Sequence, residues 1–228
     1  DRPGTYLEAT VGESAFANYE ADANTVGLWH LEEAAGSGAY IKDSTGNANN
    51  GTPTGTTFVQ GKIGKGRSFN GSSDYVALGT GPSVRNLAQY ALDMWFYINT
   101  MPGSGTADTI YSEAHGTSSS VRAKIIISNA EPSYGSVANS LVFRFRDLDA
   151  NSPINLVSSA NAVFAGQWFH TTAVYDSTSD VQKLYLNGVL VTSATNTMSS
   201  VENTAPFTTN KIGAEGTGGS EFFDGKID

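Results

Sequence analysis

The stretch DSTGNANNG, residues 43–51, concentrates oxygen-bearing side chains in a segment without large apolar residues. Side-chain oxygens recur at alternate positions: Asp43, Thr45, Asn47 and Asn49. Ca²⁺ takes about six to eight oxygen ligands from carboxylates, amides, carbonyls and water. An EF-hand is excluded, because Thr54 stands where the bidentate Glu would be needed. Two interpretations remain open: a site for a hard cation, or Asx-turns in which these side chains bind their own backbone.

Residues that could cleave a glycosidic bond are poorly placed. Glycosidases need two carboxyl groups that flank the bond. Glu32 and Glu33 are adjacent, so on a strand they point to opposite faces. Asp147 and Asp149 could share a face, but RDLDANSP reads as a loop. With no cysteine, no G-x-S-x-G motif and three dispersed histidines, the sequence predicts a protein that is not an enzyme.

Composition limits the possible partners. The 228 residues carry a net charge of -9 and only 13 Lys and Arg, which argues against binding nucleic acid or an anionic membrane surface. No apolar run reaches the roughly 18 residues of a membrane-spanning helix, so we expect no membrane insertion. Hydrophobic residues make up 39% of the chain, enough for the core of a single domain.

Short runs of β-forming residues alternate with turn residues along the chain. This pattern predicts an all-β protein, a two-sheet antiparallel β-sandwich. The strongest local signal is Asn187–Gly188, typical of a tight hairpin. Two polar stretches, 99–120 and 147–165, are predicted as loops. Strands are expected at 25–31, twice within 66–79, at 90–99, 122–128, 140–147 and 168–176, twice within 182–191, at 210–215 and at 222–228.

Several segments together resemble a known family. GLWHLEEAAGSGAYIKDSTGNANNGT, GKIGKGRSFNGSSDYVALG, WFHTTAVYD, KLYLNGVLV and FFDGKID are similar, in the right order, to laminin-G-like domains of the concanavalin A-like lectin/glucanase superfamily. The resemblance implies a jelly roll over residues 25–228, with 1–24 as an N-terminal extension or linker. It also implies that the closing strand continues past Asp228. Otherwise a sheet edge stays unpaired, unless residues 1–24 or a neighbouring domain or chain complete it.

The same resemblance implies a calcium site. In such domains Ca²⁺ is held near the chain ends by an acidic residue of the first loop and by the Asp of the closing strand. On this sequence those roles fall to Asp43 and Asp228, with Asn47 as a further ligand.

Aromatic and basic residues suggest where a sugar could bind. Trp29, Trp95 and Trp168 match core positions of the family, so we expect them in the core. Strand alternation turns Tyr185, Arg144, Arg146 and Lys124 away from the core, and they would share one face if their strands were neighbours. A planar ring beside Arg donors can bind a sugar; the alternative is an ordinary solvated face.

The sequence therefore predicts a non-catalytic carbohydrate-binding or adhesion module, stabilised by calcium, in a larger secreted or cell-surface bacterial protein. Its partner would be a glycan or another cell-surface ligand. A structural or protein-interaction module without a sugar site is the alternative, and a glycan-cleaving enzyme is the third hypothesis. The expected location is extracellular or at the cell surface.

Overall fold

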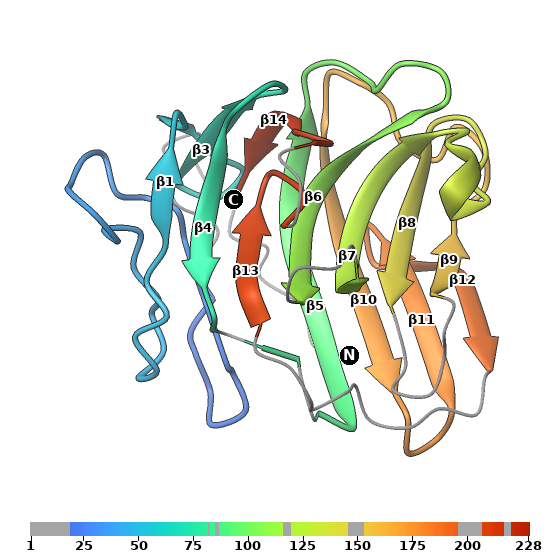
Figure 1. The fold of residues 1–228 in the computed structure, drawn as a ribbon, viewed down its shortest axis with the longest axis horizontal. Helices are drawn as coiled ribbons and strands as arrows, with labels where there is room; N and C mark the ends of the chain where they lie inside the picture. Colours follow the sequence, from blue (N-terminus) through green and yellow to red (C-terminus); the bar gives the residue numbers. More distant parts are fainter. Residues whose placement is uncertain are drawn as a thin grey trace, which may run out of the picture.

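The protein is a two-layer β-sandwich (Figure 1). The computed structural model describes residues 19–81, 83–84, 87–115, 120–145, 153–195, 207–216 and 220–228. In the first sheet the strand order is β1 (Thr52–Thr54), β4 (Tyr75–Gly79), β13 (Phe207–Ile212), β6 (Thr106–His115), β7 (Ser120–Asn129), β8 (Ser140–Phe145) and β9 (Ile154–Val157). In the second sheet it is β12 (Val189–Thr195), β11 (Val181–Leu186), β10 (Trp168–Asp176), β5 (Gln89–Ile98), β14 (Asp224–Ile227), β3 (Lys65–Asn70) and β2 (Thr57–Gln60).

The predicted all-β, antiparallel architecture is confirmed. Within the described ranges the one helical element is the short 3₁₀ turn η1 (Pro132–Tyr134), and no helix there is long and apolar enough to cross a membrane. The predicted strand 168–176 is β10 itself. The hairpin between β11 and β12 turns at Asn187 and Gly188, whose φ angles of 50° and 77° are the positive values that a type I′ turn requires.

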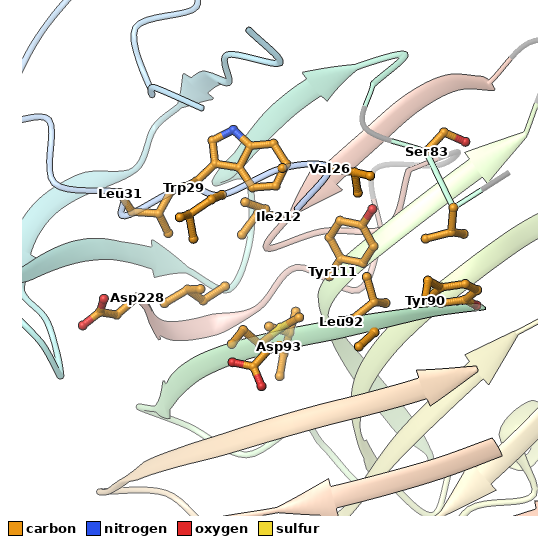
Figure 2. Close-up of a pocket in the computed structure, with 17 residues that line it drawn as sticks. Val26, Trp29, Leu31, Ser83, Tyr90, Leu92, Asp93, Tyr111, Ile212 and Asp228 are labelled. Carbon is orange, nitrogen blue, oxygen red and sulfur yellow. The ribbon is translucent and has the colours of Figure 1, made fainter. Parts of the chain in front are cut away.

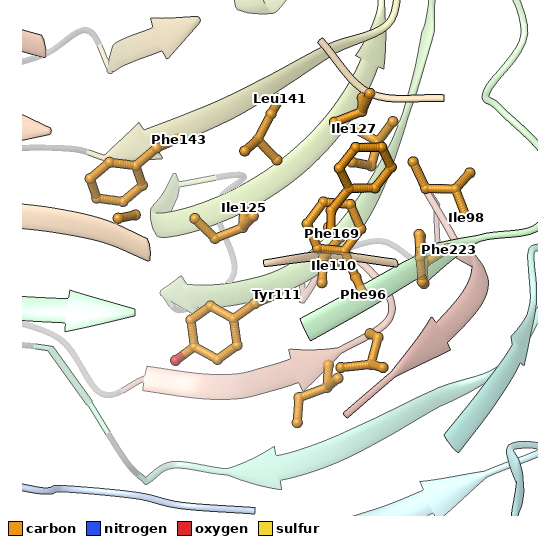
Figure 3. Packing of buried hydrophobic residues seen from close by; sticks show 14 of the residues in the cluster. Phe96, Ile98, Ile110, Tyr111, Ile125, Ile127, Leu141, Phe143, Phe169 and Phe223 are labelled. Carbon is orange, nitrogen blue, oxygen red and sulfur yellow. The ribbon is translucent and has the colours of Figure 1, made fainter. Parts of the chain in front are cut away.

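The hydrophobic core lies between the sheets (Figure 3). Inward-facing residues of the second sheet, such as Phe96 and Phe169, stack with ring centroids 5.6 Å apart. Ile125, Ile127 and Phe143 of the first sheet close the core from the other side, and all three are fully buried. Burying each such side chain contributes about 1.5–3 kcal/mol, so this layer stabilises the sandwich.

Two predicted loops contain strands, and one predicted strand is absent. Residues 99–120 include β6, which lies at the centre of the first sheet, and 147–165 include β9. The polar residues Thr109, Ser112 and Glu113 made β6 look like a loop, yet all three are fully buried with hydrogen-bond partners. In contrast, residues 25–31 form no strand, although Leu31 is buried.

The two runs on either side of NGSS belong to different sheets. β3 lies in the second sheet and β4 in the first, so residues 71–74 carry the chain from one layer to the other. Asn70 stabilises this crossing, because its Oδ1 accepts hydrogen bonds from the backbone N–H groups of Ser72, Ser73 and Asp74. A local hairpin signal therefore marks a connection between layers here.

Among the described residues, β5 has fewer backbone partners on its β14 side than on its β10 side. This strand pairs with β10 from Gln89 to Ile98, but with β14 only from Phe96 to Ile98. One further backbone pair joins Trp95 and Asp228 through two hydrogen bonds of 3.1 Å each. For residues 89–94 no backbone partner on this side is found within the described part of the chain.

Candidate functional site

The outer face of the second sheet carries a group of half-buried aromatic side chains. Along β5 and β10 the burial alternates, so that Phe96 and Phe169 face the core and their chain neighbours face outward. We call this outward set the aromatic face; it consists of Asp93, Trp95, Tyr97, Trp168, His170, Thr172 and Tyr185. The alternation within each strand turns these residues outward, and the pairing of β5, β10 and β11 brings them together.

Cross-strand contacts fix the rings in place. Trp168 lies opposite Tyr97 and His170 opposite Trp95 in the β5–β10 ladder. The Tyr97 and Trp168 rings meet at 63° with centroids 5.7 Å apart, and the Trp95 and His170 rings lie 4.9 Å apart. Each such cross-strand pair of side chains contributes about 0.2–1 kcal/mol to the stability of the sheet. The result is a row of planar, partly exposed apolar surfaces, which suits stacking against a sugar ring.

Two lysines lie over these rings. The Lys226 Nζ is 4.8 Å from the centroid of Tyr97, and the Lys62 Nζ is 5.0 Å from that of Trp95. Cation–π contacts at exposed sites are worth about 0.5–1 kcal/mol. Because the lysine side chains are flexible, they can both orient the rings and donate hydrogen bonds to a ligand.

Asp93 organises the polar part of the aromatic face. Its Oδ1 lies 2.8 Å from the Nε2 of His170, and its Oδ2 accepts a hydrogen bond of 2.5 Å from the Thr172 hydroxyl. The Asp93 side chain is still 37% exposed, so its oxygens can also accept hydrogen bonds from a ligand hydroxyl. Tyr185, on β11, lies opposite Thr172 and extends the polar region by one strand.

A groove of about 860 Å³ adjoins the aromatic face. One wall is the segment 19–28, and the other is formed by outward-facing residues near the start of β5 and the end of β10, including Gln89, Asp93 and Val174. Clefts of about 300–1,000 Å³ are typical of small-molecule sites. Asp93 belongs to both the groove and the aromatic face, so a bound chain of sugars could contact both.

The sugar-binding face predicted from sequence is not formed. Lys124 on β7 and Arg144 on β8 are opposite each other in the first sheet, whereas Tyr185 lies in the second. The prediction was wrong because it required all these strands to be neighbours in one sheet, and strand order depends on tertiary structure. Arg146 lies outside the described residues, as do Asp147 and Asp149.

Lys124 is buried and held by a hydrogen bond and two ion pairs, so it is not available on a sugar-binding surface. Its side chain is 1% exposed, and its Nζ donates to the hydroxyl of Tyr134 at 2.7 Å and to the carboxylates of Glu215, at 3.3 Å, and Glu221. Arg144 lies over the same Tyr134 ring, 5.0 Å from its centroid. We call Lys124, Tyr134, Glu215 and Glu221 the buried charge cluster; it fastens η1, Glu215 and Glu221 to the outer face of the first sheet.

The predicted calcium ligand Asp43 binds its own loop. Its Oδ1 accepts hydrogen bonds from the N–H of Leu28 and from both the N–H and the hydroxyl of Thr45, and its Oδ2 accepts one from the N–H of Asn49. The Thr45 contact is an Asx-turn. Burial acts to raise the pKa of Asp43, but these hydrogen bonds outweigh it and hold the pKa below its ordinary value.

The other two predicted ligands contact different segments. The Oδ2 of Asp228 accepts a hydrogen bond of 2.6 Å from the N–H of Ile63, and burial raises the Asp228 pKa. The Asn47 side chain donates to the carbonyl of Val26 at 3.2 Å. No cluster of three or more His, Cys, Asp or Glu suited to a metal occurs among the described residues. Calcium binding by Asp43, Asn47 and Asp228 therefore stays a prediction.

The expected core role holds for one tryptophan of three. Trp29 packs against the core, and its indole N–H donates to the carbonyl of Asn49 at 2.9 Å. Trp95 and Trp168 lie on the aromatic face, so their core assignment was wrong. The sequence held the signal that would have found them: in YALDMWFYI the core residues Leu92, Met94 and Phe96 leave Trp95 on the opposite face.

The comparisons with known proteins agree with this fold. Residues 70–228 match the family model described as the concanavalin A-like lectin/glucanases superfamily. No curated protein sequence gives a match. The similar solved structures include domain 4 of AbnA, an extracellular GH43 arabinanase from Geobacillus stearothermophilus, in complex with arabinotriose. It has 22% sequence identity and a TM-score of 0.53, over 82% of this chain and 83% of that one.

Two further structures share the architecture. The CBM40 of the Ruminococcus gnavus IT-sialidase has 17% identity and a TM-score of 0.56, over 72% of this chain and 86% of that one. The LG4-5 domains of the mouse laminin alpha1 chain have 16% identity and a TM-score of 0.50, over 71% of this chain and 39% of that one. At these identities the likenesses establish the fold alone.

Proposed function

This chain belongs to the concanavalin A-like lectin/glucanases superfamily, and we propose that it is a non-catalytic carbohydrate-binding module whose sugar site is the aromatic face. One observation carries the proposal. Trp95, Tyr97 and Trp168 are half-buried on the outer face of adjacent strands, beside a carboxylate that is held by His170. A folded protein normally buries such large rings, and a row of them on the surface marks a binding surface.

The chemistry of the aromatic face suits a neutral or mixed glycan. The rings offer apolar surfaces to the C–H groups of a sugar, and Asp93 offers acceptors for its hydroxyls. Lys62 and Lys226 add hydrogen-bond donors close to the rings. The face is shallow and open, so affinity should be modest and should grow with the number of sugar units that stack.

The similar structures support a carbohydrate ligand. Domain 4 of AbnA was solved with arabinotriose, and it matches this chain over more than four fifths of both lengths. The IT-sialidase neighbour is a CBM40. We therefore propose an oligosaccharide as the ligand class. The arabinanase that contains domain 4 of AbnA is extracellular, which supports the extracellular or cell-surface setting that we propose for this protein.

A binding role fits the site better than cleavage. Glycosidases need two carboxyl groups about 5–9.5 Å apart across the scissile bond. Asp93, the carboxylate that adjoins the rings, already binds His170 and Thr172 in the sheet. Its exposure and its fixed partners suit hydrogen bonding to sugar hydroxyls.

Titration with an oligosaccharide panel that includes arabinotriose tests the proposal. We expect Trp95→Ala and Trp168→Ala to weaken binding about tenfold or more, because each removes a stacking surface. Phe58→Ala is the matched control, since Phe58 is 37% exposed but lies on β2, away from the aromatic face. If no glycan binds, the module has a structural or protein-interaction role. If both Trp variants bind as the wild type does, the sugar site lies away from the aromatic face.

A further inference from the structure

The sequence contains three Asn–Gly pairs: Asn50–Gly51, Asn70–Gly71 and Asn187–Gly188. Asparagine is a thermolabile residue. In an Asn–Gly pair the backbone nitrogen of the Gly can attack the side-chain amide carbon of the Asn, because Gly has no Cβ that hinders the approach. The reaction requires a Gly nitrogen that is free to lose its proton and an Asn side chain that is free to turn. The structure separates the three pairs by these two requirements.

Room for an Asn side chain to turn does not come from the interior of the sandwich. The cavity between the two sheets has a volume of about 160 Å³ and is lined by residues such as Trp29, Leu92 and Tyr111 (Figure 2). Among the described residues that line it, none belongs to an Asn–Gly pair. The environment of each pair is therefore set by its own turn.

The first pair is held at both reacting groups. The N–H of Gly51 donates to the carbonyl of Ile41 at 2.7 Å. The Oδ1 of Asn50 accepts a hydrogen bond of 3.0 Å from the N–H of Asp43. Gly51 is buried, and a Cβ atom placed on it would lie 2.6 Å from a methyl group of Val76. The ring that the reaction forms has no space here until the loop opens.

The second pair is also held. The N–H of Gly71 donates to the carbonyl of Phe223 at 3.0 Å. The Oδ1 of Asn70 accepts three backbone hydrogen bonds where the chain crosses between the sheets, and its Nδ2 donates to the hydroxyl of Ser73 at 3.0 Å. A reaction at Asn70 requires that these bonds break first, and such local opening costs free energy before any chemistry begins.

The third pair meets both requirements. Asn187 and Gly188 are exposed at the tip of the β11–β12 hairpin. Within the described structure, neither the N–H of Gly188 nor the Nδ2 of Asn187 has a hydrogen-bond acceptor. Apart from its chain neighbours, no described atom lies within 4 Å of the position that a Cβ on Gly188 would take. The nitrogen that attacks and the group that leaves are thus both open to water.

One contact activates the Asn187 side chain. Its Oδ1 accepts a hydrogen bond of 2.9 Å from the backbone N–H of His170. When a nucleophile adds to an amide carbon, the oxygen takes up negative charge, and a backbone N–H aimed at that oxygen stabilises the charge. The N–H of Asn187 donates in return to the carbonyl of His170 at 2.8 Å, so the turn is anchored on β10.

We propose that Asn187 is a site of spontaneous deamidation, which converts it to aspartate and isoaspartate ahead of Asn50 and Asn70. The proton of the Gly188 N–H goes to hydroxide, and the nitrogen forms a bond to the Cγ of Asn187. The Cγ–Nδ2 bond breaks, and ammonia leaves with a proton from water. Water then opens the succinimide ring at one of its two carbonyl carbons, which gives aspartate or isoaspartate. One water is consumed and one ammonia is released.

The isoaspartate form changes the hairpin. Its backbone passes through the former side chain and is one CH₂ longer, which a two-residue type I′ turn does not accommodate. The two hydrogen bonds between Asn187 and His170 are then lost. We therefore expect the thermal midpoint of the isoaspartate form to lie about 5 °C below that of the fresh protein.

Ageing of the folded protein at mildly alkaline pH tests the proposal, because hydroxide removes the Gly188 proton. Mass spectrometry of proteolytic fragments, after chromatographic separation, quantifies their asparagine, aspartate and isoaspartate forms. We expect the Asn187 fragment to convert about tenfold or more faster than the Asn50 and Asn70 fragments, since local opening must precede the reaction at those two. In urea, where all three pairs lose their folded environment, the three rates should be alike.

Asn187→Gln is the matched variant, because a glutamine side chain would have to close a larger ring. It should release less ammonia than the wild type, and its thermal midpoint should stay constant during ageing while that of the wild type falls. The proposal is overturned if Asn187 converts no faster than Asn50 and Asn70 in the folded protein, or if Asn187→Gln releases as much ammonia as the wild type. The comparison of fragments uses the wild type alone, so it holds whether or not the variant folds.

Discussion

Trp95 and His170 face each other across the β5–β10 ladder with ring centroids 4.9 Å apart, and Asp93 holds the Nε2 of His170 at 2.8 Å. The ring of Trp95 is thus positioned by the sheet and by a hydrogen-bonded neighbour before any ligand arrives. A ring that is already ordered loses little conformational entropy on binding. This relationship makes the aromatic face a preorganised surface.

Removing the Asp93 side chain should weaken sugar binding with little loss of stability. In Asp93→Ala the imidazole of His170 and the hydroxyl of Thr172 lose their shared partner, and a ligand loses an acceptor. We expect affinity for the oligosaccharide to fall about tenfold, and the midpoint of thermal unfolding to change little because Asp93 is part-exposed. Asp93→Asn, which keeps one acceptor oxygen, should lose less. Equal affinity of all three proteins would remove Asp93 from the site.

Asp43 should contribute strongly to stability through its loop. Asp43→Ala leaves the N–H groups of Leu28, Thr45 and Asn49 without their acceptor, which should lower the free energy of unfolding by about 3 kcal/mol. Because the folded pKa of Asp43 is lowered, this contribution is present above the ordinary Asp pKa and is lost as the pH falls through the folded pKa. Urea unfolding of both proteins at neutral and acidic pH measures the effect. A loss that is unchanged at acidic pH would contradict it.

Calcium should act through the same carboxylate. The Oδ2 of Asp43 accepts one of the four described hydrogen bonds and keeps a lone pair for a cation. We expect Ca²⁺ to raise the thermal midpoint of the wild type and EDTA to reverse the rise, while Asp43→Ala shows neither response. Asp22→Ala, at an exposed turn, is the control. If the thermal midpoint of the wild type does not change with calcium, this ligand set is excluded. If Asp43→Ala responds fully to calcium, the ion binds at another site.

Glu113 should make stability depend on pH near neutrality. This residue of β6 is fully buried; burial raises its pKa to about 7, although its carboxylate accepts hydrogen bonds from Ser83 at 2.6 Å and from the N–H of Val84 at 3.0 Å. Since the folded pKa lies above the unfolded one, the stability that the protonated form contributes at low pH is lost as the pH rises through about 7.

The variant Glu113→Gln isolates this effect. It stays neutral, so between about pH 4.5 and pH 8 it should gain about 2–3 kcal/mol relative to the wild type, measured by urea unfolding at both values. The variant also loses the carboxylate oxygen that accepts from the N–H of Val84. This loss lowers the stability of the variant equally at both pH values, so it cancels when the two values are compared. Asp108, whose pKa burial also raises to about 7, is present in both proteins and cancels as well. A difference that does not change with pH would show that Glu113 is ionised throughout.

The buried charge cluster should behave as one unit. Lys124→Met leaves Glu215 and Glu221 without their shared cation, which should destabilise the protein by about 3–5 kcal/mol. Adding Glu221→Gln removes one of the stranded charges, so the double variant should be more stable than Lys124→Met alone. Thermal unfolding of the wild type, Lys124→Met, Glu221→Gln and the double variant forms a double-mutant cycle, which measures the coupling between Lys124 and Glu221. Strict additivity would show that the two residues do not interact.

Much of the strand pattern could be predicted because it depends on local sequence. The alternation of WFHTTAVYD defines β10 and its buried face, and Asn187–Gly188 defines the hairpin that follows, since few other residues accept two positive φ angles in succession. The same alternation determines that Trp95 points away from Phe96. These features require only the two-residue period of a strand and the conformational freedom of a turn.

The tertiary structure decided which strands are neighbours and which polar residues are buried. β6 reads as a loop because Thr109, Ser112 and Glu113 are polar, and only partners far along the chain satisfy them inside the sandwich. Lys124 looked solvent-facing, yet Glu215, 91 residues away, joins the cluster that buries it. Local sequence specifies the face on which a side chain lies, but what covers that face is set by segments that meet only when the two sheets close.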